Sequence, residues 1–451
     1  MNCFDVFLSK SSLLLALLIF TALSSGCGSR ADQSVDQTFS VSGALSNLSA
    51  GKSVILKNNG TESLTLSANG AFTFSTALAT GATYAITVDT QPVGMSCTVT
   101  NGTGAIAGAD TNVAISCLKQ PAFAYVANYS SNTVSAYSIN TTTGALTSIG
   151  AAVATGNSPR AIVVDPSGKF AYVTNSVGNT VSAYSINATT GALTSIGAAV
   201  ATGNSPSFIA VDPNGKFAYV TNLMGNTVSA YSINATTGAL TSIGTAVATG
   251  SSPWAIAIAP SGQFLYVTNR SSDTVSAYSI NATTGVLTSV GTAVATGDNP
   301  FAIALDPSGK FVYVTNYTGN TVSAYSINAT SGALTSIGAD VVTTGRNPSS
   351  IAVDPNGKFV YVGNDLGNPV SAYTINATTG ALTSIGATGA TGSSTASIVV
   401  DPSGTFAYVA HYANKTISPY NINVSTGVLT SIGVAVSTGN TPVSIAIAPA
   451  H

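Results

Sequence analysis

Short hydrophobic runs that alternate with polar turns are the dominant pattern of this chain. In the stretch that begins at Ser158 the runs read AIVVD, FAYVTN, TVSAYSIN and ALTSIGAAV, and Asp-Pro-Ser-Gly, Asn-rich and Gly-rich segments separate them. Runs of this length, rich in β-branched and aromatic residues and bounded by turn formers, predict β-strands. No segment of this region shows the 3.6-residue period of an amphipathic helix.

These four runs recur as one unit. The Tyr of the second run falls at Tyr125, Tyr172, Tyr219, Tyr266, Tyr313, Tyr361 and Tyr408, so the successive spacings are 47, 47, 47, 47, 48 and 47 residues. Seven copies of a four-stranded unit predict an all-β fold, a seven-bladed β-propeller. The first copy lacks the first run, and an additional first run, 443–447, follows the last copy. We therefore expect the C-terminal strand to complete the first blade and to close the ring without a free edge.

Residues 38–118 carry a different pattern. Runs such as SVILKN, TYAITV and VAISC alternate with Gly, Asn and Ser turns, at a spacing of about ten residues. This spacing predicts a small immunoglobulin-like β-sandwich that precedes the propeller of residues 119–451. The sandwich contains Cys97 and Cys117, and in an oxidising compartment we expect these two to form a disulfide.

The N-terminal segment has the pattern of an export signal. Lys10 precedes an apolar stretch, 13–23, which is followed by small residues and Cys27. This resembles a bacterial lipoprotein signal of residues 1–27, in which Cys27 becomes the lipidated N-terminus that holds the protein to the membrane, with 28–37 as a tether. Leu23 lies four residues before the Cys instead of three, so an ordinary signal peptide is the alternative. By the same resemblance, Gly28 implies the outer membrane of the cell envelope.

Composition excludes several classes of partner. Only 6% of residues are charged, whereas about 25% are charged in a typical domain. The net charge is −2. Nucleic acid is therefore not an expected partner, since it requires a basic face. The cysteines have no histidine or further cysteine at ligand spacing, so we expect no metal and no cofactor. Nothing in the pattern predicts self-association, and we expect a monomer.

One box of the repeat allows a family to be named. It reads AYVTN at 171–175 and 218–222, LYVTN at 265–269 and VYVTN at 312–316, and each copy is followed by the segment TVSAY. The box resembles that of the YVTN-repeat and lactonase-like seven-bladed propellers, over residues 119–451. The resemblance implies the propeller fold. It implies less about function, because the superfamily includes lactone hydrolases as well as surface proteins.

Residues that break the repeat are the candidates for a ligand site. In a propeller, the loops entering the innermost strands and the loops between the second and third strands surround one mouth of the channel. A residue that recurs in the repeat, such as the Asp of the Asp-Pro turns, which is replaced by Ala259 in one copy, is expected to serve the blade itself. The irregular residues expected at the mouth are Arg160, Trp254, Phe301, Tyr129, Tyr317 and Tyr412, and Asp365 falls on the same face. Arginine beside aromatic rings suits a sugar, a lactone or an anionic small ligand. Drifted surface positions of copied repeats are the alternative interpretation.

Catalysis at this mouth has few candidate groups. Lactone hydrolysis needs a base for water and a cation or donors for the oxyanion, yet the chain's only Glu, Glu62, lies in the small domain. The best set is His411 as base with Arg160, Arg270 or Arg346 as oxyanion partner. A structural role for His411 is the alternative.

The sequence therefore favours a non-enzymatic envelope lipoprotein whose propeller binds a protein or glycan partner. The alternative, implied by the family resemblance, is a hydrolase of a sugar lactone or related lactone, similar to 6-phosphogluconolactonase. A closed pocket that holds His411 or an Asp together with an Arg would distinguish the enzyme.

Overall fold

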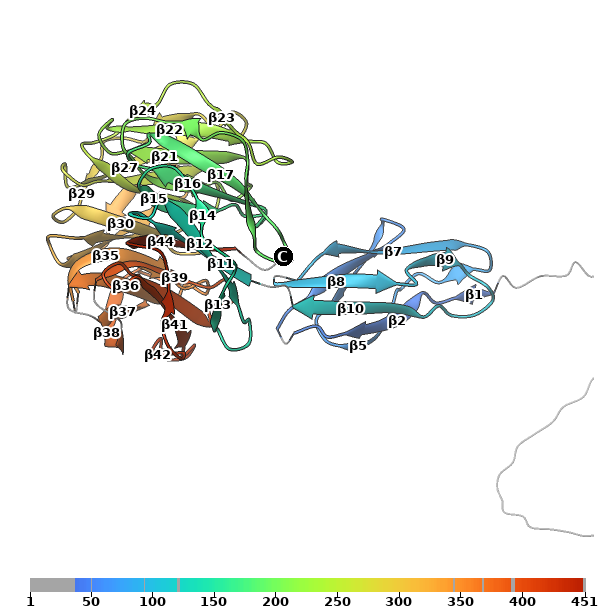
Figure 1. Ribbon diagram of the computed structural model, residues 1–451. Coiled ribbons are helices and arrows are strands. Elements are labelled where there is room, and N and C mark those ends of the chain that lie inside the picture. The colour runs from blue at the N-terminus through green and yellow to red at the C-terminus, as the bar shows by residue number, and fades with distance from the viewer. Residues whose placement is uncertain are drawn as a thin grey trace, which may run out of the picture.

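A computed structural model describes residues 37–448, apart from residues 50, 93, 120–121, 344, 367–368 and 391–393. Figure 1 shows two β-units in sequence, a small one in blue and cyan and a larger ring of blades. Every regular element in the described ranges is a strand, which confirms the all-β prediction. None of the described residues forms a helix long and apolar enough to cross a membrane. The predicted signal segment and Cys27 lie outside the described residues.

The small unit is a β-sandwich of two four-stranded sheets, in the orders β5-β2-β10-β8 and β4-β3-β7-β9, with the short pair β1-β6 beside them. Alternating residues such as Val54 and Leu56 of one sheet and Val113 and Ile115 of the other are buried in one shared core. Cys97 and Cys117 lie opposite each other on β8 and β10 and form the expected disulfide. The strands are β1 (Thr38–Phe39), β2 (Ser42–Ser46), β3 (Val54–Asn58), β4 (Glu62–Leu66), β5 (Gly70–Thr73), β6 (Leu78–Ala79), β7 (Thr83–Thr90), β8 (Met95–Thr100), β9 (Thr103–Ala105) and β10 (Val113–Lys119).

The larger unit is the seven-bladed propeller, and its seven sheets are antiparallel. The blade that joins the two ends of the ring, called the seam blade below, consists of β44 (Pro442–Ala448), β11 (Ala122–Asn128), β12 (Thr133–Ile139), β13 (Leu146–Ser148) and β14 (Val153–Ala154). The next three blades are β15 (Pro159–Val164), β16 (Phe170–Asn175), β17 (Thr180–Ile186), β18 (Leu193–Ser195) and β19 (Val200–Ala201); β20 (Pro206–Val211), β21 (Phe217–Asn222), β22 (Thr227–Ile233), β23 (Leu240–Ser242) and β24 (Val247–Ala248); and β25 (Pro253–Ile258), β26 (Phe264–Asn269), β27 (Thr274–Ile280), β28 (Leu287–Ser289) and β29 (Val294–Ala295).

The last three blades continue the same order from the innermost strand outward. They are β30 (Pro300–Leu305), β31 (Phe311–Asn316), β32 (Thr321–Ile327), β33 (Leu334–Ser336) and β34 (Val341–Val342); β35 (Arg346–Val353), β36 (Phe359–Leu366), β37 (Pro369–Ile375) and β38 (Leu382–Ala390); and β39 (Thr395–Val400), β40 (Phe406–His411), β41 (Thr416–Ile422), β42 (Leu429–Ser431) and β43 (Val436–Ser437).

The ring closes as the sequence predicts. β44 is the innermost strand of the seam blade and pairs antiparallel with β11, with Phe123 opposite Ala448 and Tyr125 opposite Ala446. The first and last parts of the propeller therefore share one sheet, and the ring has no open edge at this seam.

The outermost strand differs from the prediction. The sequence suggests one continuous run, ALTSIGAAV, but in six blades this run forms two short strands that both pair with the third strand, as β18 and β19 do with β17. The break falls at Gly197, whose φ of 60° is left-handed and ends the strand. Only the blade of β35–β38 has an unbroken outer strand among the described residues.

The repeated Tyr of the second strand joins neighbouring blades. Its ring is buried between two blades, and its hydroxyl donates to a Gly carbonyl of the following blade, as Tyr125 does to Gly191 at 2.8 Å. The bond that crosses the seam, from Tyr408 to Gly144, has a length of 3.1 Å. A buried Tyr hydroxyl needs such a partner, so the repeat fixes both the packing and the order of the blades.

Candidate functional site

A cavity of about 300 Å³ opens at one mouth of the propeller. It lies within the size range of small-molecule sites. Its walls come from two positions of the repeat, the start of the innermost strand and the residue that follows the YVTN box or its degenerate copy. The lining residues are Arg160, Phe208, Trp254, Arg270, Phe301, Tyr317, Ser349, Asp365, Thr395, Ala396, Tyr412 and Val443.

A break in the strand pairing accompanies the first of these positions. The innermost strand of each of the seven blades has a register shift at its start, as between Pro159 and Ala161 in β15 and between Pro253 and Ile256 in β25. The residues inside the shift, Arg160 and Trp254, are left out of the regular pairing. A bulge re-aims side chains at the end of a strand, so this irregularity accounts for their place in the wall of the mouth.

The YVTN box stabilises this bulge. In β16 the hydroxyl of Thr174 accepts a hydrogen bond from the backbone N–H of Ala161 at 3.0 Å, which replaces a ladder bond that the bulge removes. The amide of Asn175 donates to Thr180 and Ser182 on the third strand, at 3.1 and 2.9 Å. The repeated Thr and Asn are therefore structural, while the residues on either side of the bulge are free to vary.

Cations and aromatic rings alternate along one side of the mouth. The guanidinium of Arg160 lies 5.2 Å from the ring centre of Tyr129 and 4.7 Å from that of Trp254. The guanidinium of Arg270 lies 4.4 Å from Trp254 and 4.9 Å from Phe301. Both arginines thus make cation–π contacts with two rings each, and Trp254 lies between them.

The stack continues to the single carboxylate that lines the mouth. Phe301 stacks on Tyr317 with a ring separation of 5.1 Å and an angle of 26°. The Tyr317 hydroxyl donates to Oδ2 of Asp365 at 2.8 Å. Burial and the neighbouring Asp365 raise the pKa of Tyr317 to about 12, so Tyr317 keeps its proton and remains a donor at neutral pH.

Several buried polar atoms in this mouth have no hydrogen-bond partner. They are Nε of Arg160, Nε1 of Trp254 and Oδ1 of Asp365. A buried polar atom without a partner is costly, and such groups are uncommon in a folded protein. Three of them around one cavity, two donors and one acceptor, are what a site for a polar ligand would contain.

The two arginines are electrostatically strained. Burial lowers the pKa of Arg160, and burial together with the charge of Arg160 lowers the pKa of Arg270. Within the described part of the chain, neither guanidinium lies within salt-bridge distance of a carboxylate, since the one ion pair there joins Lys57 to Asp89. The mouth therefore holds two uncompensated positive charges in a partly buried place.

The structure brings together five of the six residues expected to bind a ligand. Five of them line the cavity: Arg160, Trp254, Phe301, Tyr317 and Tyr412. Tyr129 is not in the lining, but its ring contacts the guanidinium of Arg160. Asp365 joins them although the sequence offers it no catalytic role. The signal was available, because Asp365 is the only acid at the repeat position that holds Tyr129, Arg270 and Tyr412 in other blades.

Two of the predicted catalytic residues do not line the cavity. His411 is fully buried at the end of β40, where its Nε2 pairs with Ser418 at 3.1 Å. It occupies the place of the Asn of the YVTN box, and burial lowers its pKa to about 4. Arg346 is exposed at the first residue of β35, where it lies opposite Leu366 of β36. The predicted pairing of His411 with an arginine is therefore not seen. His411 is buried inside its blade beside Ser418, and Arg346 is exposed outside the cavity.

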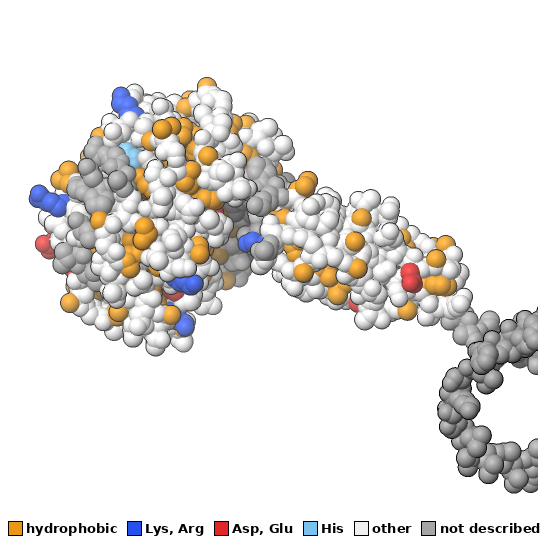
Figure 2. All heavy atoms as spheres, turned by 90° about the horizontal axis from the view of Figure 1, so that it is seen from below, with side chains coloured by type: hydrophobic (Ala, Val, Ile, Leu, Met, Phe, Trp, Pro, Cys, Tyr) orange, Lys and Arg blue, Asp and Glu red, His pale blue; other side chains and the backbone are white. Residues whose placement is uncertain are grey.

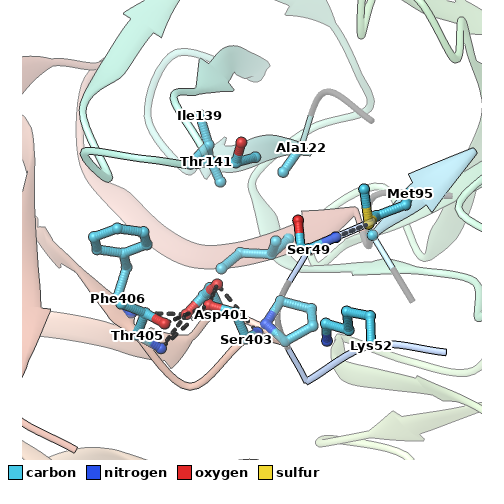
Figure 3. Close-up of a pocket in the computed structure, with 13 residues that line it drawn as sticks. Ser49, Lys52, Met95, Ala122, Ile139, Thr141, Asp401, Ser403, Thr405 and Phe406 are labelled. Atoms are coloured by element: carbon cyan, nitrogen blue, oxygen red, sulfur yellow. Dashed lines mark hydrogen bonds between the residues drawn. The ribbon is translucent and has the colours of Figure 1, made fainter. Parts of the chain in front are cut away.

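A second cavity, of about 240 Å³, lies where the sandwich meets the propeller. Figure 3 shows Ser49, Lys52 and Met95 of the sandwich on one side and Asp401 and Phe406 on the other. The carboxylate oxygens of Asp401 accept hydrogen bonds from the backbone N–H groups of Ser403, Thr405 and Phe406, at 3.1, 2.9 and 2.7 Å. This carboxylate is committed to its Asp-Pro turn, as the sequence predicts, and the cavity offers little chemistry beyond Lys52.

The residues that the structure describes contain no cluster of three or more His, Cys, Asp or Glu that could bind a metal ion. Their charged side chains are also few and scattered. Figure 2 shows few blue and red groups on the face that it presents.

A family model decides the relationship of the chain. The model of the seven-bladed lactonase propeller matches residues 82–208, 198–346 and 341–447. The chain belongs to the lactonase family of β-propellers. No curated protein matches it. The family sequence resemblance and the seven-bladed architecture predicted from the repeat are both confirmed.

Solved structures of the same fold carry related descriptions. A candidate 6-phosphogluconolactonase from Bacteroides uniformis is 22% identical, with a TM-score of 0.65 over 73% of this chain and 100% of its own. Another from Bacteroides fragilis is 24% identical, with a TM-score of 0.65 over 73% and 98%. The periplasmic gluconolactonase of Pseudomonas aeruginosa is 17% identical, with a TM-score of 0.65 over 73% and 99%. At these identities the likeness establishes the fold.

The preferred functional prediction needs correction. The sequence favoured a non-enzymatic scaffold because of the predicted anchor, the small domain before the propeller and the scarcity of catalytic carboxylates in the propeller. Membership of the lactonase family supports the hydrolase alternative instead. The prediction gave too much weight to the few ionisable groups and too little to the family resemblance.

Proposed function

We propose that this protein is a lactone hydrolase and that the mouth cavity is its active site. The observation that carries the proposal is the unpartnered carboxylate oxygen of Asp365 in the same cavity as Arg160 and Arg270. Membership of the lactonase family supports the same reaction class. A carboxylate with one oxygen free and two cations without a salt bridge are the two kinds of group that ester hydrolysis requires.

Asp365 acts as the base in this proposal. Its Oδ2 is held by the Tyr317 hydroxyl, which fixes the carboxylate and leaves Oδ1 for a water molecule. Oδ1 takes one proton of the water while the water oxygen bonds to the lactone carbonyl carbon. The carbonyl oxygen becomes an oxyanion, and the guanidiniums of Arg160 and Arg270 stabilise its charge.

The intermediate then collapses with cleavage of the ring C–O bond. The carbonyl forms again, and the leaving ring oxygen receives the proton that Asp365 had taken. The product is a hydroxy acid, which ionises in water, and Asp365 returns to its starting state. No metal or redox step is needed for this balance of atoms and electrons. A hydrolysis that releases acid is convenient to follow by titration.

The test is hydrolysis of sugar and aromatic lactones by the purified protein, followed by titration of the released acid and corrected for spontaneous opening. We expect Asp365→Asn to lower kcat by at least about 100-fold, which is the range of a lost general base. The matched control is Asp298→Asn, an exposed acid on a neighbouring loop that does not line the cavity, and we expect its rate to be unchanged. Folded protein that opens no lactone, or an Asp365→Asn variant with the wild-type rate, would contradict the proposal.

We also propose that the protein works in the cell envelope, held to the membrane by lipid on Cys27. The N-terminal sequence pattern supports this location, and so does the disulfide of Cys97 and Cys117, because disulfides persist in oxidising compartments. The outer membrane and a monomeric state remain parts of the same proposal.

A further inference from the structure

The arginines of the mouth are arranged to receive an anion at their edges. Tyr129, Trp254 and Phe301 lie close to the two guanidiniums, and the N–H groups of a guanidinium point outward in its own plane. Nε of Arg270 donates to Asn299 at 3.0 Å, whereas Nε of Arg160 has no partner. A carboxylate is the planar anion that fits such an edge, and its charge would offset two buried cations.

The remaining walls are poor in acceptors for hydroxyl groups. Five aromatic side chains line the cavity: Phe208, Trp254, Phe301, Tyr317 and Tyr412. The hydroxyl of Ser349 donates to the carbonyl of Thr395 at 2.6 Å, and both residues are buried. Apart from the hydroxyl oxygens, Asp365 is the one lining side chain that supplies a hydrogen-bond acceptor. A sugar lactone brings several hydroxyl donors, and these walls offer them one charged acceptor only.

An aromatic ring meets these walls without that cost. Ring faces and edges of the lining residues can contact an aryl group in offset or edge-to-face geometry. The same rings bring the two arginines into position, so the apolar and cationic parts of the site are adjacent.

We propose that the preferred substrate is an aromatic lactone that carries a carboxylate. The aryl ring lies among Phe208, Trp254 and Tyr412. The carboxylate is next to the lactone carbonyl, and it shares the N–H groups of Arg160 and Arg270 with the oxyanion that forms there. This inference rests on the proposed lactone hydrolysis and adds the class of substrate. It differs from the sugar lactones named in the descriptions of the structural neighbours.

Trp254 allows binding to be measured without catalysis. It is the only tryptophan of the chain, so the intrinsic tryptophan emission of the protein comes from this cavity wall. Benzoate is the probe, with benzamide as its neutral analogue and gluconate as a polyhydroxylated anion. We expect benzoate to bind at least about tenfold more tightly than either, since charge-assisted hydrogen bonds and ring contacts are both needed.

Arginine variants locate the anion. Arg160→Gln and Arg270→Gln should each weaken benzoate binding about tenfold or more, while Arg346→Gln, an exposed arginine outside the cavity, should leave it unchanged. Melting temperatures of all three variants identify any loss that comes from unfolding, and a variant that fails to fold is replaced by Arg→Lys at the same position. Equal or tighter binding of gluconate, or benzoate binding that ignores both arginines, would overturn the inference.

Hydrolysis distinguishes a failure of the inference from a failure of the proposed function. Coumarin-3-carboxylate and glucono-δ-lactone are compared as substrates of the purified protein. A higher kcat/KM for the coumarin carboxylate supports the inference. Faster opening of glucono-δ-lactone leaves the hydrolase standing and overturns the substrate class. Tight benzoate binding with no hydrolysis of either lactone refutes the proposed function and so removes the substrate assignment that rests on it.

Discussion

At the scale of single residues, the repeat separates what serves the blade from what serves the mouth. Thr174 and Asn175 of one YVTN box stabilise a bulge and join two strands, and their equivalents do the same in the three other blades that have the full box. The residue that follows the box varies from blade to blade. Reading that position around the ring gives Tyr129, Ser176, Leu223, Arg270, Tyr317, Asp365 and Tyr412. One position of the repeat therefore supplies the acid, an arginine and three tyrosines of the site.

His411 gives a prediction at this scale. It is buried where other blades have Asn, and burial lowers its pKa from 6.5 to about 4. Between these two values the unfolded chain binds the proton and the folded chain does not, so the stability present above pH 6.5 is lost as the pH falls. The loss amounts to roughly 3 kcal/mol at most. We expect His411→Asn to reduce the drop in melting temperature between neutral pH and about pH 4.

The reciprocal variant is the control for this prediction. Asn175 holds the equivalent position in another blade and is also fully buried. Asn175→His should add acid sensitivity of similar size. If His411→Asn loses as much stability on acidification as the wild type does, His411 is not the source.

At the scale of strands and blades, irregular strand pairing places the residues of the candidate site, and regular strand pairing closes the ring. The register shift at the start of an innermost strand, as between Pro159 and Ala161, falls at the residues that line the mouth. The regular pairing of β44 with β11 closes the ring. Sequence patterns locate both strands, but a bulge of one residue leaves no clear mark in a run such as PRAIVV.

The seam gives the prediction at this scale. Ile445 on β44 is 4% exposed and packs with Ala124, Val126 and Tyr408, which come from the start and the last repeat of the propeller. Ile445→Ala should lower the free energy of unfolding of the propeller by about 2–5 kcal/mol, as a large-to-small change in a core does. Val434→Ala is the control, because Val434 is 86% exposed, and it should change stability by less than about 0.5 kcal/mol. Denaturant titration measures both, and equal small effects would mean that β44 contributes little to closure.

At the scale of the whole molecule, the mouth and the sandwich lie at opposite ends of the blades. Thr395 at the start of β39 lines the mouth, whereas Asp401, just beyond the end of the same strand, lines the cavity beside the sandwich. Figure 1 shows the sandwich attached at one side of the ring. A tether at residues 28–37, as the sequence predicts, would therefore leave the mouth accessible to solutes.

The lipid anchor is the prediction at this scale. If Cys27 carries lipid, cells fed labelled palmitate should label the wild type and not the Cys27→Ala variant. Because the mouth lies away from the sandwich, the purified variant should open lactones at the wild-type rate. A Cys27→Ala protein that still takes up palmitate would refute the anchor, and one that folds but loses hydrolysis would refute the independence of anchor and site.

The sequence by itself determined the repeat, its three inner strands, the seven blades, the closure by the last strand and the disulfide. These follow from local patterns, from a fixed period and from counting. It also proposed most residues of the mouth, because irregular positions in a repeat are visible without a structure. Tertiary structure decided that His411 is a buried substitute for Asn and that Asp365 keeps a free oxygen beside Tyr317. The partner of Asp365, Tyr317, lies 48 positions away in the sequence, and no local pattern contains such a contact.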